Sequence, residues 1–312
     1  KWDAAYVSEK LRQETFNFEE EILKPYLPLN EAVIGIFTIA QKLFGLRFEQ
    51  TDELELYHPE VAAYKVTDEK GTFVSYFYTD FHPRPGKRGG AWMTSFRSQY
   101  QQNNENHRPQ IAIVCNFSKP TSKGPALLTF NELTTLFHEF GHALHGMLAN
   151  TRYPSLSGTS VSWDFVELPS QLMENWCYEQ EALAIFAKHY KDGSAIPMEM
   201  VKKIKAQASF LEGMATLRQV SFGLLDMSWH STDPKNITDV ATFEQASFKG
   251  TDLFPSQSGS CMSTAFSHIF QGGYAAGYYS YKWAEVLDAD AFERFKEAGI
   301  FNPQVASDFK EH

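Results

Sequence analysis

Residues 131–143 read NELTTLFHEFGHA, and within them His138, Glu139 and His142 form the pattern H-E-x-x-H. Positions four residues apart lie on the same face of a helix, so both imidazoles can reach one metal ion. Glu139 lies about 100° around the helix, where its carboxylate can contact a water on that metal without being a ligand itself. The stretch therefore predicts a metal-binding helix that carries a carboxylate suited to proton transfer.

The flanking residues predict that this stretch is helical. Thr129 and Glu132 fit a capping box, S/T-x-x-E, directly before the apolar run. Apolar side chains fall on one side of the helical wheel, namely Leu133, Leu136, Phe140, Leu144 and Met147. The histidines fall on the other side. A helix with incidental histidines on its exposed face remains the alternative until a third ligand is found.

The composition narrows the class of protein. The chain has 312 residues, 43% of them hydrophobic, which suffices for one large domain or two small ones. A net charge of −10 argues against a nucleic-acid or anionic-membrane partner, because phosphate binding needs a basic surface. The 3 cysteines are too few for a disulfide framework, which favours a reducing compartment. From these few cysteines we expect a cytoplasmic protein. No apolar run is long enough to span a bilayer.

Helical patterns dominate the rest of the chain. Helices are expected over residues 1–23, 31–45, 163–190 and 197–230 and from residue 282 onward, with Asn30 capping the second of them. Gly213 and Gly223 are weak points in the fourth. Short strands are expected over residues 61–66 and 72–78. The best strand candidate is PQIAIVCNF (residues 109–117), which we expect at a sheet edge where an extended peptide could add.

The stretch HPRPGKRGG (residues 82–90) superficially suggests a phosphate-binding loop. It lacks the G-K-[ST] start of a helix, and Pro83 and Pro85 suit a turn. We therefore expect a turn.

A zinc hydrolase usually has three protein ligands and one water. The extension H-E-x-x-H-x-x-G-x-x-H fails here, because His145 occupies the glycine position and Leu148 the last histidine position. A carboxylate fits better, since a polar stripe follows on the next predicted helix: Glu167, Gln171, Glu174 and Tyr178. An exposed polar face is the alternative. Ligating histidines also need an acceptor for their other nitrogen, and the candidates are Asp164, Gln171 and Glu174.

The stretch QGGYAAGYYSYKW (residues 271–283) offers donors for a tetrahedral oxyanion. Tyr274, Tyr278 and Tyr281 are spaced by four and three residues, which is also typical of an aromatic core helix. The glycines that precede and interrupt them permit a hinged loop that closes on substrate.

Three separated stretches, FHEFGHALH, LSGTSVSWDFVELPSQLMENW and FSHIFQGGYAAGYYSYKW, resemble the thimet oligopeptidase family of zinc peptidases (M3). The resemblance runs over essentially the whole chain. It implies a mainly α, zincin-like catalytic region with a small β-sheet beside the H-E-x-x-H helix. It implies one Zn²⁺ per chain, bound by His138, His142 and Glu167, with Glu139 as general base. The residues implied as catalytic besides Glu139 are His268, Tyr278 and Tyr281, and those implied in substrate binding are Tyr274, Gly272 and Gly273.

Members of that family are about twice as long as this chain. Residues 1–312 are therefore expected to form a single catalytic region, without the family's N-terminal region and C-terminal end, and the chain begins with Lys1 rather than methionine. The expected activity is zinc-dependent hydrolysis of short peptides, as an oligopeptidase or a peptidyl-dipeptidase. The full-length form is expected to be a monomer. A non-catalytic, zinc-containing fragment that binds peptides or acts as a scaffold is the alternative.

Overall fold

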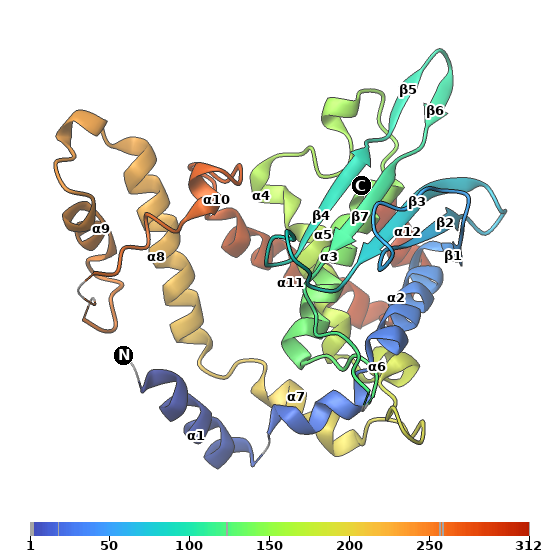
Figure 1. Ribbon diagram of the computed structural model, residues 1–312, viewed down its shortest axis with the longest axis horizontal. Helices are drawn as coiled ribbons and strands as arrows, with labels where there is room; N and C mark the ends of the chain where they lie inside the picture. Colours follow the sequence, from blue (N-terminus) through green and yellow to red (C-terminus); the bar gives the residue numbers. More distant parts are fainter. Residues whose placement is uncertain (1–2, 18, 123, 256, 258, 312) are drawn as a thin grey trace. The chain divides into compact units, whose positions relative to one another are not determined.

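The computed structural model describes residues 3–17, 19–122, 124–255, 257 and 259–311 (Figure 1). Helices predominate in this part of the chain, and a small sheet accompanies them, which confirms the mainly α fold class. The chain forms two compact units. The first comprises Lys1–Phe18, Ser162–Glu167 and Ala206–Val286, and the second comprises Glu19–Val161, Leu168–Lys205 and Leu287–His312. A single catalytic region over residues 1–312 stays a prediction.

The second unit contains a mixed sheet with the strand order β1-β2-β3-β7-β4. Its strands are β1 (Arg47–Gln50), β2 (Ala62–Thr67), β3 (Phe73–Asp80), β4 (Trp92–Arg97) and β7 (Gln110–Val114). β3 and β7 run parallel, whereas the other pairs are antiparallel. A separate hairpin consists of β5 (Tyr100–Gln102) and β6 (Glu105–His107). The strands predicted over residues 61–66 and 72–78 are thus confirmed as β2 and β3.

The prediction that residues 109–117 form a sheet edge is wrong. β7 lies inside the sheet, with β3 on one side and β4 on the other. Its residues Ile111–Val114 are all buried, as expected for a strand covered on both faces. Because its backbone groups already pair with two neighbours, β7 cannot accept an added peptide strand. Among the described strands, β1 and β4 end the sheet.

The predicted metal-binding helix is α3 (Phe130–Leu148), and both of its ends are held by side chains. At the N-terminus, Glu132 N donates to Thr129 Oγ1 at 3.1 Å and Thr129 N donates to Glu132 Oε2 at 2.8 Å, which confirms the capping box. At the C-terminus, the Arg108 guanidinium donates to the carbonyls of Met147 and Ala149 at 2.6 and 2.8 Å. These bonds satisfy backbone groups that a helix end leaves open.

α3 packs against β3, β4 and β7 through its apolar face (Figure 1). The Phe140 ring lies 5.8 Å from that of Phe77 on β3, and a Cβ at Gly146 would meet Ile111 Cδ1 at 2.8 Å. The rings of Phe37 and Phe48 complete this aromatic core, 6.1 and 5.9 Å from Phe140. The core therefore fixes the rotation of α3, and with it the direction of the histidine face.

The N-terminal helices begin at other residues than expected. α1 spans Ala4–Phe16, followed by the 3₁₀ helix η1 (Glu20–Tyr26); residues 1–2 and 18 of the predicted first helix lie outside the described residues. α2 spans Leu29–Phe44, and its N-cap is Pro28. The prediction that Asn30 caps it is wrong, because Asn30 already lies in the first turn.

The helix predicted over residues 163–190 is broken into short pieces. These are α4 (Trp163–Val166), α5 (Leu168–Glu174), η3 (Asn175–Tyr178) and α6 (Gln180–Phe186). Pro169 lacks a backbone N–H, so it suits the first turn of a new helix and not the interior of a long one. Glu167 consequently lies at the junction between α4 and α5, and the predicted polar stripe does not run along one continuous helix.

The helix predicted over residues 197–230 is also divided. α7 (Met198–Gln207) and α8 (Glu212–Ser231) are separated at Leu211, whose φ is +56°. Gly213 and Gly223, the predicted weak points, lie inside α8. The remaining helices are η2 (Pro154–Leu156), η4 (Pro234–Asn236), α9 (Val240–Phe248), α10 (Ser267–Phe270), α11 (Ser280–Ala298) and α12 (Pro303–Glu311). None of the helices in the described residues has the length and apolarity needed to cross a bilayer.

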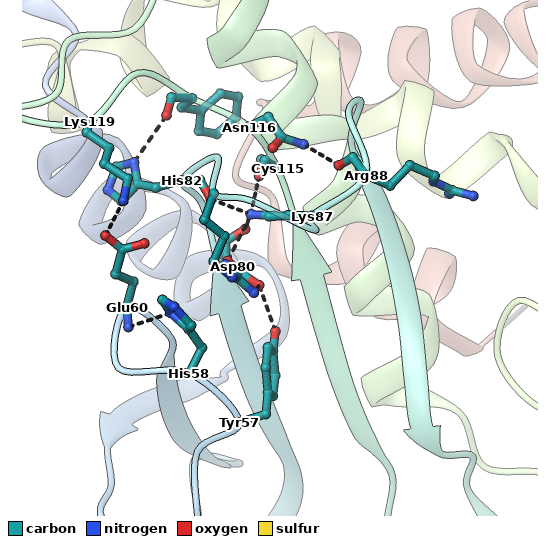
Figure 2. A network of polar contacts seen from close by, with 12 residues as sticks. Tyr57, His58, Glu60, Asp80, His82, Lys87, Arg88, Cys115, Asn116 and Lys119 are labelled. Carbon is teal, nitrogen blue, oxygen red and sulfur yellow. Dashed lines mark hydrogen bonds and ion pairs between the residues drawn. The ribbon is translucent and has the colours of Figure 1, made fainter.

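A buried ionic network holds the loop between β3 and β4 (Figure 2). Asp80 accepts hydrogen bonds from Arg84 at 2.7 and 2.8 Å, from Lys87 at 2.8 Å and from the Tyr57 hydroxyl at 3.0 Å. Burial alone would raise the pKa of Asp80, but these hydrogen bonds outweigh it and lower the pKa to about 2. Lys87 Nζ also donates to the carbonyls of His82 and Cys115. Residues 82–90 thus form a turn that is held by Lys87, as expected, and not a phosphate-binding loop.

Candidate active site

Three of the predicted residues come together as possible metal ligands. One ligand atom each from His138, His142 and Glu167 lies within 4.8 Å of the other two. The two imidazole rings stand nearly perpendicular, at 88°, with centroids 4.9 Å apart. Two imidazoles and one carboxylate are a donor set that catalytic zinc sites use. The residues present therefore fit a metal ion of this kind.

A close helix contact explains how the chain reaches this geometry. Gly141 lies between the two histidines of the motif, and a Cβ there would come within 2.6 Å of Ser170 Cα on α5. Only glycine lets the backbones of α3 and α5 approach so closely. Glu167 directly precedes α5, so this contact carries its carboxylate towards the histidine face of α3.

The structure selects one acceptor among the three candidates for the outer nitrogen of a ligand. His138 Nδ1 lies 2.7 Å from Glu174 Oε1. A hydrogen bond at Nδ1 leaves Nε2 for the metal and fixes the orientation of the ring. Glu174 therefore orients His138. Asp164, by contrast, accepts a hydrogen bond from the Tyr279 hydroxyl at 3.3 Å.

Glu139 lies almost completely inside the protein, with 6% of its surface exposed. Burial raises the pKa of the Cys115 thiol, and the charge of the Glu139 carboxylate raises it further. The Glu139 carboxylate therefore lies close enough to Cys115, the residue after β7, to affect the ionisation of its thiol. Glu139 is not a member of the ligand group, as the motif predicts for a general base.

His145, the third histidine of α3, is not in the group of possible metal ligands. Burial and then the neighbouring His142 lower the pKa of His145 to about 4. The imidazole of His145 is therefore neutral at pH 7 and has a structural place beside His142.

The tyrosine stretch surrounds Glu167 with phenols. Glu167 is 1% exposed, and Tyr274 Oη donates to its Oε1 at 2.7 Å. The Tyr281 ring stacks on that of Tyr274 at 5.2 Å and 18°. Burial raises the pKa of Tyr281 far above its usual value, and the charge of Glu167 adds to the effect. Tyr281 thus keeps its proton and can act as a hydrogen-bond donor.

His268 and Tyr278 belong to the same aromatic group. The His268 ring on α10 lies 6.0 Å from the rings of both Tyr274 and Tyr278. Tyr278 Oη donates to Gln219 Oε1 at 3.1 Å, and its ring packs in a buried cluster with Leu225, Phe266 and Ile269. The first unit therefore brings together the four residues predicted from this part of the sequence.

The glycine pair before Tyr274 is explained by tight packing. A Cβ at Gly272 would lie 2.9 Å from His268 Cα, and one at Gly273 would lie 2.8 Å from the Trp163 ring. Gly273 also has a φ of +89°, which favours glycine. The ring of Trp163 lies 4.6 Å from that of Tyr274, tilted by 50°, and Trp163 was not predicted as part of the site. Its only signal in the sequence is an aromatic side chain one helical turn before Glu167.

Known proteins resemble this chain over nearly its whole length. The sequence pattern that describes Peptidase family M3 matches residues 1–312. The chain is 42% identical to oligopeptidase A of Escherichia coli (strain K12) over 311 residues, which are 99% of this chain and 46% of that protein. It is 40% identical to dipeptidyl carboxypeptidase of the same organism over 313 residues, again 99% of this chain and 46% of that protein.

A plant relative shows the same pattern. The chain is 43% identical to the organellar oligopeptidase A of Arabidopsis thaliana, chloroplastic/mitochondrial, over 310 residues, which are 96% of this chain and 39% of that protein. The chain thus spans less than half the length of each of these relatives.

Proposed function

The chain belongs to peptidase family M3, and from this premise we propose that it is the catalytic region of a zinc peptidase that hydrolyses short oligopeptides. The observation that carries the proposal is the grouping of His138, His142 and Glu167, with Glu139 on the same helix as the two histidines. The names of the relatives, oligopeptidase A and dipeptidyl carboxypeptidase, support peptides as the substrate class. A cytoplasmic location and a monomeric full-length form stay predictions.

In this mechanism His138, His142 and Glu167 would hold the metal. When bound, Zn²⁺ supplies Lewis acidity towards a water molecule and the scissile carbonyl. Glu139 takes the proton of the attacking water and passes it to the leaving amine. Glu174 holds the His138 ring in the orientation that leaves Nε2 for the metal.

The aromatic group contributes donors on the substrate side. We assign Tyr278, Tyr281 and His268 to stabilisation of the oxyanion, and Tyr274, Gly272 and Gly273 to substrate binding. Tyr281 is suited to this role because its raised pKa keeps it protonated. Tyr278 donates to Gln219, so it would exchange that partner for the substrate. Such an exchange fits a loop that adjusts when substrate binds.

The decisive experiment compares the parent chain with Glu139→Gln in the zinc-loaded state, using a fluorogenic peptide. Removal of a general base lowers the rate by roughly 10²–10⁴-fold, whereas zinc content should stay the same because Glu139 is no ligand. Glu181→Gln, an exposed glutamate on α6, is the matched control and should keep full activity. Equal rates for the parent and Glu139→Gln, or a purified chain without affinity for zinc, would refute the proposal.

Endopeptidase and dipeptide-releasing activity can be separated with the same protein. A peptidyl-dipeptidase needs the free carboxylate of its substrate, so an amidated C-terminus abolishes cleavage. An oligopeptidase cleaves the amidated and the free peptide alike.

The alternative is a chain that binds zinc and peptide without cleaving. Zinc binding and peptide binding by the parent chain, combined with no hydrolysis, would identify that case.

A further inference from the structure

The loop that carries the tyrosines is tied to one buried carboxylate on α8. We propose that Asp226 is a positioning residue that holds this Tyr loop (residues 271–279, between α10 and α11) in the conformation needed for catalysis. The inference rests on the proposed function, because it concerns the tyrosines assigned to that reaction. Asp226 bonds to the backbone of this loop and not to the phenol oxygens, so its role is indirect.

Both oxygens of Asp226 bind the backbone of the Tyr loop. Ala276 N donates to Oδ1 and Tyr278 N donates to Oδ2, each at 2.9 Å. Asp226 is fully buried, at 0% exposure. Burying a carboxylate is costly unless it accepts hydrogen bonds. The two N–H groups therefore stabilise the buried Asp226 carboxylate, and the carboxylate in turn fixes the backbone of the loop.

His230 supports the carboxylate from the next turn of α8. Its Nδ1 lies 2.8 Å from Asp226 Oδ1 and 2.9 Å from the carbonyl of Asp226. The ring thus limits rotation of the carboxylate and keeps both oxygens directed at the loop.

The loop backbone has a conformation that needs such a partner. Ala276 has a φ of +54°, in the left-handed region that is unfavourable for a residue with a Cβ. The Ala276 N–H is one of the two donors to Asp226, so the strained residue and the anchor are directly bonded. Without the charge, the loop would lose the interaction that offsets this strain.

The anchored residues lie directly beside the functional phenols. Ala276 is two residues from Tyr274, whose hydroxyl reaches Glu167, and Tyr278 is itself anchored through its backbone. Asp226 therefore sets where the phenols lie with respect to Glu167. Weakening the anchor should lower kcat more than it raises KM, because phenols that stabilise the transition state would be misplaced in part of the population.

The first unit contains a second buried carboxylate that can serve as a control for Asp226. Glu244 on α9 is also a buried carboxylate, 8% exposed, that accepts backbone N–H bonds, from Met262 at 2.8 Å and Ser263 at 2.6 Å. The segment that it anchors, residues 261–263, lies before α10 and outside the Tyr loop. Glu244→Gln therefore controls for the general loss of a buried carboxylate anchor.

The test measures hydrogen exchange and peptide hydrolysis on the zinc-loaded chain. Asp226→Asn should speed amide exchange in peptides covering residues 271–281 by roughly tenfold or more and lower kcat by a similar factor, as expected for weakening a charged hydrogen bond. Ala276→Gly in the Asp226→Asn background should slow that exchange again, because glycine adopts the positive φ without strain. Glu244→Gln should leave exchange in residues 271–281 unchanged.

A second variant keeps the test decisive if Asp226→Asn does not fold. Ala276 is exposed, so Ala276→Val adds strain at the positive φ without overpacking a core, and it should speed exchange in residues 271–281 and lower kcat. If Ala276→Val leaves exchange unchanged, or if Glu244→Gln raises it as much as Asp226→Asn does, Asp226 is not the anchor of the loop. Exchange is measured without turnover, so a chain that lacks peptidase activity would refute the proposed function while the exchange result still decides on Asp226.

Discussion

The hydroxyl of Tyr274 donates a 2.7 Å hydrogen bond to Oε1 of Glu167, across 107 positions of the sequence. Glu167 is 1% exposed, so this phenol replaces water at one of the carboxylate oxygens. A neutral donor at this oxygen orients the carboxylate. The loop proposed to contact substrate is thereby bonded directly to the proposed third ligand.

Removing the Tyr274 hydroxyl should weaken metal binding. Partners that orient a ligand typically contribute about 10–100-fold to metal affinity, so we expect a loss of that order in Tyr274→Phe. Zinc affinity is measured by competition with a chromogenic chelator. Tyr279→Phe is the control, because Tyr279 also donates to a carboxylate, that of Asp164, which is not in the ligand group. Equal affinities of the parent and Tyr274→Phe would show that the contact has no effect on the metal.

Glu174 should contribute to metal affinity through His138. Glu174→Ala removes the acceptor 2.7 Å from His138 Nδ1, so the ring loses its preferred orientation and affinity for zinc should fall by about 10–100-fold. The comparison is Glu179→Ala, which removes a nearby glutamate that pairs with Lys205. The prediction fails if both variants bind zinc equally tightly.

The close contact of α3 and α5 makes Gly141 intolerant of a side chain. Gly141→Ala places a Cβ against Ser170 Cα, so the helices must separate, at a cost of about 1–3 kcal/mol in the free energy of unfolding. The separation should also displace Glu167 and weaken zinc binding. Urea unfolding of the metal-free chain and zinc titration check the two effects.

Substitution of Gly213 by alanine should raise the free energy of unfolding, in contrast to Gly141→Ala. It lies in α8, where a Cβ would meet nothing within 4 Å. Gly213→Ala should therefore stabilise the chain by up to about 1 kcal/mol, since alanine has the higher helix propensity. Stabilisation in both glycine variants would show that α3 and α5 are not closely packed.

The Asp80 network should make stability depend on pH in the acid range. The pKa of Asp80 is about 2 in the folded chain and about 4 in the unfolded chain. A carboxyl whose pKa is lowered by folding contributes stability above its unfolded pKa and loses it as the pH falls towards its folded pKa. We therefore expect a loss of roughly 2–3 kcal/mol between about pH 4 and pH 2 from this group.

Asp80→Asn tests that assignment. It leaves Lys87, which is 4% exposed, without its carboxylate, so the free energy of unfolding at pH 7 should fall by about 3–5 kcal/mol. The part of the pH dependence due to Asp80 should disappear as well. Asp290→Asn, at an exposed position on α11, should change neither quantity. An unchanged slope between pH 2 and pH 4 in Asp80→Asn would contradict the prediction.

The sequence by itself determined the local parts of the site. A capping box and an i, i+4 histidine pair are set by spacing along one helix, so α3 and its two candidate imidazole ligands could be predicted without a structure. The strands β2 and β3 followed from their β-branched and aromatic residues. A polar stripe and a tyrosine-rich stretch made Glu167 and the tyrosines candidates, and the resemblance of three stretches to the M3 family implied their roles.

Tertiary packing decided the rest, because it joins residues that no sequence period relates. The buried run of β7 has the same composition at an edge as inside a sheet, and only pairing with both β3 and β4 places it inside. Three acceptors were equally plausible for the His138 ring, and the packing of α5 on α3 selects Glu174. No sequence motif marks Asp226. Its hydrogen bonds with Ala276 N and Tyr278 N form only when α8 and the Tyr loop fold together.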